Sequence, residues 1–113
     1  MYNYESRIRR YMAWNRELQE KFMKLELRCA RLEKLLHEAN AVFYKLPAGK
    51  RRNSDSERIC EDLSLQLRDA TEEKIEVIGM MRRNQANYTR FILSHDLDIT
   101  EDFPLDLNEL VML

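Results

Sequence analysis

The first half of the chain repeats its apolar side chains at alternating intervals of three and four residues. The spacing holds without a slip, with Asn15 as a polar member, through Ile8, Tyr11, Asn15, Leu18, Phe22, Leu25, Cys29, Leu32, Leu36, Ala39, Phe43 and Leu46. This spacing is the period of a heptad whose a and d positions face a partner helix. It predicts a helix over residues 5–46 that packs as a coiled coil.

A second stripe of the same period follows after a gap. Its members are Cys60, Leu63, Leu67, Ala70, Lys74, Val77, Met81, Asn84, Tyr88 and Phe91, so two polar residues interrupt it. Ser54 precedes the stripe and Glu57 follows three residues later, which is the spacing of a capping box at a helix N-terminus. A second helix is therefore predicted over residues 55–95.

The segment between the stripes, "KLPAGKRRNSDSE", decides how the two helices are arranged. Pro47 disfavours helical geometry at the residue before it, and Gly49 permits a positive φ. Carrying the first heptad through this segment would place Cys60 at a d position, whereas the second stripe needs it at a. We therefore predict an all-α fold in which a loop over residues 47–54 closes a long two-helix hairpin. The alternative is an interrupted parallel coiled-coil rod.

The hairpin makes a specific prediction about which residues meet. In this hairpin, a residue of the first helix and a residue of the second lie at the same height along the helix axis when their residue numbers sum to roughly 101. Asn15 then lies near Asn84, so that the two amides can satisfy one another. Tyr11 and Trp14 are placed beside Tyr88 and Phe91 at the end away from the loop.

Each helix also carries apolar side chains outside its main stripe: Met23, Leu27, Leu35, Val42, Leu65, Ile75, Ile78, Met80 and Ile92. Leaving them in water forgoes about 25 cal/mol for each Å² of apolar surface. We therefore expect the hairpin to be completed by a second copy or by another helical subunit. The opposite charges of Lys21 and Glu26, and of Arg28 and Glu33, fit a homodimer whose first helices pair in parallel.

Charge separates the last 18 residues from the rest. All 19 Lys and Arg precede residue 96, whereas residues 96–113 hold six acids and no base. Large apolar residues alternate with these acids, and Pro104 interrupts any extension of the second helix. This tail is expected to bind a protein partner through Phe103, Leu107, Leu110 and Val111, as short amphipathic helices do. The alternative is that it folds back on its own basic helices.

The chain carries no pattern typical of a catalytic, cofactor or metal site. Its two glycines, Gly49 and Gly79, are isolated, so no glycine-rich loop is present to bind phosphate. His37 and His95 have no nucleophile and carboxylate spaced to act with them. Cys29 and Cys60 lack the closely spaced ligands of a zinc site and are expected to be small core residues.

The basic cluster Lys50–Arg52 allows three interpretations: a solvated turn, a nuclear import signal or a nucleic-acid contact. We favour the turn, because no continuous basic stripe accompanies the cluster. For the same reason, nucleic acid is not an expected partner. Ser54 follows two arginines, so it is a candidate phosphorylation site, although an N-cap is its simpler role.

These features favour a non-catalytic coiled-coil adaptor or scaffold subunit that mediates protein–protein assembly. The alternative is a dimeric transcription-regulatory protein that recruits a partner through its acidic tail. No run approaches the roughly 18 apolar residues of a membrane span, and the N-terminus lacks the apolar core of a signal peptide. An intracellular location, cytoplasmic or nuclear, is expected.

Overall fold

The computed structural model describes residues 4–95, and this part of the chain is almost entirely helical. Helix α1 spans Tyr4–Lys45, the short helix α2 spans Ala48–Arg51, and α3 spans Asp55–Ser94. No strand occurs in these residues. The described part of the chain therefore belongs to the predicted all-α class.

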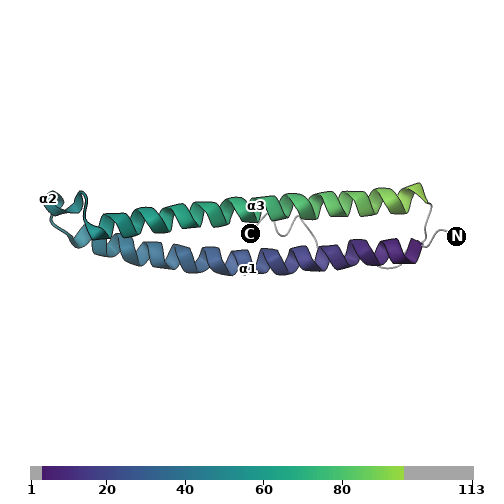
Figure 1. Ribbon diagram of the computed structural model, residues 1–113, viewed down its shortest axis with the longest axis horizontal. Coiled ribbons are helices and arrows are strands. Elements are labelled where there is room, and N and C mark those ends of the chain that lie inside the picture. Colours follow the sequence, from purple (N-terminus) through teal and green to yellow (C-terminus); the bar gives the residue numbers. More distant parts are fainter. Residues whose placement is uncertain (1–3, 96–113) are drawn as a thin grey trace. The chain divides into compact units, whose positions relative to one another are not determined.

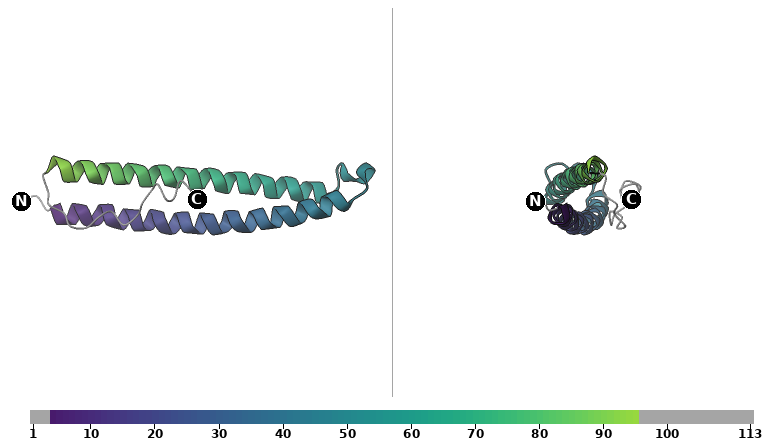
Figure 2. Two further views of the ribbon diagram at one scale, coloured as in Figure 1. Left: turned by 180° about the vertical axis from the view of Figure 1, so that it is seen from behind. Right: turned by 90° about the vertical axis from the view of Figure 1, so that its right-hand side faces the viewer.

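The helices are organised into two compact units, and α1 packs against α3 in each. Among the described residues, the first unit contains 4–23 and 75–95, and the second contains 24–74. In the first unit the purple start of α1 lies beside the yellow-green end of α3 (Figure 1), and Figure 2 shows the same pairing from behind. The ring of Tyr11 lies 5.8 Å from that of Phe91. This contact confirms the antiparallel hairpin and shows that the interrupted rod is wrong.

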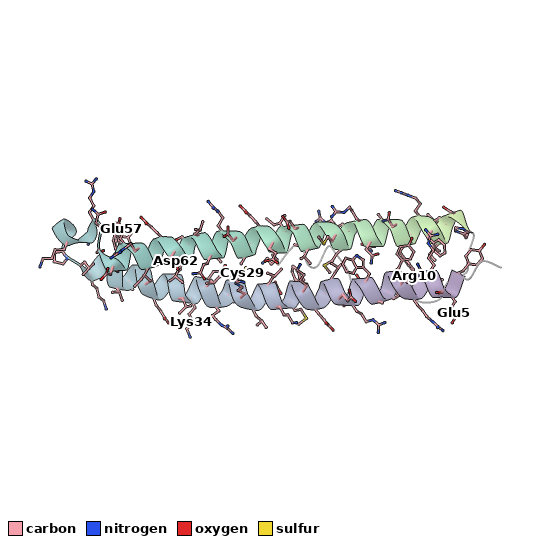
Figure 3. The ribbon with its side chains drawn as sticks, in the orientation of Figure 1. Glu5, Arg10, Cys29, Lys34, Glu57 and Asp62 are labelled. Carbon is pink, nitrogen blue, oxygen red and sulfur yellow. The ribbon has the colours of Figure 1, made fainter. Side chains whose placement is uncertain are left out.

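The two heptad stripes form the contact between α1 and α3 within each unit, which we call the seam. Its buried residues in the first unit are Asn15, Leu18, Phe22, Val77, Met81, Asn84, Tyr88 and Phe91. In the second unit they are Leu25, Cys29, Leu32 and Ala70, and Leu63 and Leu67 pack against the last three. Figure 3 shows Cys29 between the two helices, and its Sγ lies 4.0 Å from the hydroxyl oxygen of Thr71. This pair obeys the predicted numbering rule.

The seam also constrains how a second copy can bind. The a and d side chains of α1 are directed at α3, so they are not free to face another α1. Parallel pairing of two α1 helices through this stripe is therefore incompatible with the hairpin. A second copy would have to contact other faces.

The turn between the long helices differs in detail from the predicted loop. The amide of Leu46 donates to the carbonyl of Phe43 over 3.1 Å as α1 ends, and Pro47 precedes the single turn of α2. The residue with positive φ is Asn53, at 58°, and not Gly49. Asparagine tolerates this left-handed conformation better than most residues with a side chain. Gly49 lies in α2, where a glycine is not required.

The two seam asparagines do not satisfy one another, so that prediction is wrong. The Asn84 side-chain amide donates instead to the backbone carbonyl of Tyr11 over 3.0 Å. Asn15 is completely buried, and neither its Nδ2 nor its Oδ1 has a hydrogen-bond partner. A buried amide without a partner loses its hydration and gains nothing in return, which costs about 1–3 kcal/mol.

This difference predicts that replacing the two asparagines changes the free energy of unfolding by unequal amounts. Asn15→Leu should raise the free energy of unfolding by about 1–2 kcal/mol, because it removes unsatisfied polar atoms while keeping a similar volume. Asn84→Leu is the matched control and should gain less, because it also removes a hydrogen bond. Urea denaturation of both variants measures the difference. A clear loss of stability in Asn15→Leu would show that this amide has a partner.

Candidate interaction surfaces

Ser54 caps α3 in the structure. Its hydroxyl accepts a hydrogen bond from the Glu57 amide over 3.0 Å and donates to the Arg51 carbonyl over 2.7 Å. Both bonding roles of the hydroxyl are thus used within the turn, and the N-cap predicted from the sequence is present. Phosphorylation of Ser54 stays a prediction.

Arg51 has a structural role that sequence reasoning missed. Its Nε donates to the Leu46 carbonyl over 3.0 Å, and its Nη2 donates to the Tyr44 carbonyl over 2.9 Å. Its guanidinium also lies 5.6 Å from the centre of the Tyr44 ring. Arg51 therefore satisfies carbonyls that the end of α1 leaves without helical partners. The only signal in the sequence was a basic residue a few positions beyond a helix end.

Aromatic rings fill the seam near the ends of α1 and α3 in the first unit. The ring of Tyr11 lies 5.9 Å from Tyr88, and the ring of Phe91 lies 4.6 Å from His95. The guanidinium of Arg7 lies 4.7 Å from the centre of the Phe91 ring, within the range of a cation–π interaction. Trp14 does not join the cluster as predicted. It is 46% exposed and makes no ring contact within residues 4–95, because it lies beside the seam and not in it.

The other residues predicted to mediate assembly also lie along the seam. Half-buried members are Ile8, Tyr11, Leu36, Phe43, Leu63 and Leu67, and the remaining predicted residues on these helices are buried. The structure brings them together as the internal contact of the hairpin. Residues that contact a partner must therefore face away from the seam.

One outward-facing set lies on α1 in the second unit. Leu27, Leu35 and Val42 are 68%, 42% and 57% exposed, although all three are large and apolar. They follow one another at intervals of about two helical turns, so they lie on one side of α1. Lys24, Arg31, Lys34 and Glu38 lie near them on the same side, and Figure 3 shows Lys34 pointing away from α3. We call this surface the α1 outer face.

A second outward-facing set lies on α3 in the first unit. Ile75 is 61% exposed and Leu93 is 75% exposed, and both lie on the same side of the helix. An open groove along that side is lined by Arg82, Gln85, Ala86, Thr89, Arg90, Leu93 and Ser94. We call Ile75 and these seven residues the α3 basic face.

A second groove lies between α1 and α3 in the second unit. Its apolar lining comes from Phe43, Tyr44, Cys60 and Leu65, and its polar lining includes Glu57, Glu61 and Arg68. The mixed charge of this groove distinguishes it from the α3 basic face, whose only charged residues are arginines.

Several predicted sites have no counterpart in the described residues. Phe103, Leu107, Leu110 and Val111 of the acidic tail lie outside them. Within residues 4–95, no three His, Cys, Asp or Glu side chains are grouped closely enough to hold a metal ion. Neither long helix has a stretch apolar enough to cross a membrane.

The contacts of Arg51 predict that the turn depends on this residue and not on the basic cluster as a whole. Arg51→Ala should lower the free energy of unfolding by about 1–2 kcal/mol, because two carbonyls lose a charged donor. Arg52→Ala removes the same charge from the neighbouring position, where the side chain is exposed, and should change stability little. The denaturation midpoints of Arg51→Ala and Arg52→Ala test this role for Arg51. Equal midpoints would contradict it.

The chain was also compared with protein-family models, with curated proteins and with solved structures, and none of the three comparisons found a match.

Proposed function

We propose that this protein is a non-catalytic adaptor or scaffold subunit, in which the helical hairpin associates with further helices. The observation that carries the proposal is the exposure of Leu27, Leu35 and Val42 on the α1 outer face. The hairpin uses one stripe on each helix and leaves this second set of large apolar side chains in water.

The spacing of the three residues favours a helix as the binding element. Anchors at intervals of about two turns match the apolar positions that one helix presents to a groove or to another helix. Burying one such side chain completely stabilises a complex by about 1.5–3 kcal/mol relative to leaving it exposed. Three partly exposed anchors are therefore enough to support specific association.

The seam of the second unit supports the same conclusion. Leu36, Phe43, Leu63 and Leu67 occupy seam positions yet remain only half-buried there. Two helices alone form a thin core, and a third or fourth helix would complete the burial of these side chains. We propose a second copy of the chain as the first partner to test.

Self-association should therefore depend on the α1 outer face. Wild-type protein should be at least dimeric at micromolar concentration, and Leu27→Gln/Leu35→Gln/Val42→Gln should weaken the dimer by about tenfold or more. Helicity should stay unchanged, because these side chains are already exposed in the hairpin. Sedimentation equilibrium measures the dissociation constant, and circular dichroism checks the fold.

A matched control replaces three polar residues of the same face, as Arg31→Gln/Lys34→Gln/Glu38→Gln, and should keep most of the affinity. If the wild type is a folded monomer of 13.7 kDa, self-association is refuted. The adaptor proposal would fail entirely if, in addition, pull-downs with the wild type and the apolar triple variant recovered the same proteins from cell extract.

A further inference from the structure

The charged residues near the end of α3 are all basic. From Val77 to His95 the sequence contains Arg82, Arg83 and Arg90 and not one acidic residue. All three arginines are exposed, and none forms an ion pair with another residue of the described range 4–95. Elsewhere on α3, by contrast, Arg58 and Arg68 lie beside carboxylates of their own helix. The end of α3 thus presents positive charge that its own helix does not neutralise.

Apolar side chains accompany this charge. Leu93 and Ile75 mark the two ends of the α3 basic face, and Ala86 and Thr89 lie in the groove between them. Arg82 and Arg90 border the same groove. A ligand that fits this surface carries several negative charges interspersed with large apolar side chains.

Residues 96–113 of this chain have that composition. They contain six acids and no base, with Leu97, Ile99 and Phe103 between the acids. We propose that this C-terminal segment docks on the α3 basic face of its own chain. Asp98, Glu101 and Asp102 would face the arginines, and the apolar residues would cover Leu93, Ala86 and Ile75. The proposal is independent of self-association through the α1 outer face.

The length of the segment is sufficient. Along the helix axis, Leu93 lies about 17 Å from Arg82 and about 27 Å from Ile75, at 1.5 Å per residue. An extended chain covers these distances with about five and about eight residues, at 3.3 Å each. After a short reversal following His95, the chain returns to the height of Leu93 at about residue 98, so the stretch around Asp102 and Phe103 reaches Arg82 and residues 105–107 come within reach of Ile75.

The other surfaces fit this segment less well. The groove of the second unit carries Glu57 and Glu61, which would repel an acidic ligand. The α1 outer face includes Glu38 among its bases. The α3 basic face also begins immediately before the segment in the chain, so that docking there closes a short loop at small entropic cost.

Carbodiimide crosslinking of the full-length protein tests the proposal. This reagent joins a carboxylate to an amine with no spacer, so R82K/R90K keeps the charges of the face and supplies the amines. R68K places an amine in the mixed-charge groove and serves as the matched control. Links from the introduced amines to residues 96–109 should exceed those in the control by about fivefold or more, and they should weaken at high salt. Equal yields in the two variants would overturn the proposal.

A mixture of ¹⁴N- and ¹⁵N-labelled R82K/R90K distinguishes the chain's own segment from that of a second copy. Links within one isotope only are expected, and mixed-isotope links in the statistical proportion would overturn docking within the chain.

Charge reversal provides a second measurement that does not depend on crosslinking. In R82E/R90E, chymotrypsin should cleave after Leu105 and Leu107 about fivefold faster than in the wild type, whereas R68E should leave the rate unchanged. Adding Glu101→Arg and Asp102→Arg to R82E/R90E should restore protection, because attraction is re-established with the charges exchanged. If cleavage after Leu105 and Leu107 proceeds equally fast in the wild type and in R82E/R90E, the segment is not docked on this face.

Discussion

Burial of one heptad stripe on α1 against one on α3 is the interaction on which the rest of the structure depends. Without it, each helix would expose a long, mostly apolar stripe, and isolated helices gain little stability from their own backbone hydrogen bonds in water. The pairing also determines which side chains meet, because an antiparallel contact couples the height of each residue on α1 to one position on α3. The approach of Tyr11 to Phe91 and of Cys29 to Thr71 follows from this coupling.

The same pairing places two asparagines in an apolar contact. Only Asn84 finds a hydrogen-bond acceptor there, at the Tyr11 carbonyl, and Asn15 remains buried with its amide unsatisfied. A buried polar residue in a coiled-coil seam lowers stability and can favour one register over its neighbours. The cost of Asn15 is consistent with such a role, since the other buried seam residues apart from Asn84 are apolar side chains that tolerate small shifts.

Two helices have limited capacity for burial, and this limit gives the protein its interaction surfaces. A helix in a hairpin covers about one side of its partner, so apolar residues elsewhere on either helix remain in water. The α1 outer face combines such residues with mixed charges, whereas the α3 basic face combines them with arginines alone. The α1 outer face therefore suits another helix of mixed charge, and the α3 basic face suits an acidic segment.

The sequence by itself determined the helices and their apolar stripes and favoured the antiparallel pairing over a rod, because these depend on periodicity, on helix breakers and on the lengths of the two repeats. It also indicated the Ser54 cap, which rests on a spacing of three residues. Only the tertiary structure decided that Asn53 takes the left-handed conformation, that Arg51 binds the carbonyls of α1, and that Trp14 lies outside the aromatic cluster. It likewise decided that Asn84 binds a backbone carbonyl instead of Asn15. The positions of Trp14, Asn15 and Asn84 depend on the relative rotation of the helices, and each hydrogen bond depends on differences of about 1 Å in side-chain reach, since a hydrogen bond weakens steeply outside its narrow range of distance and angle.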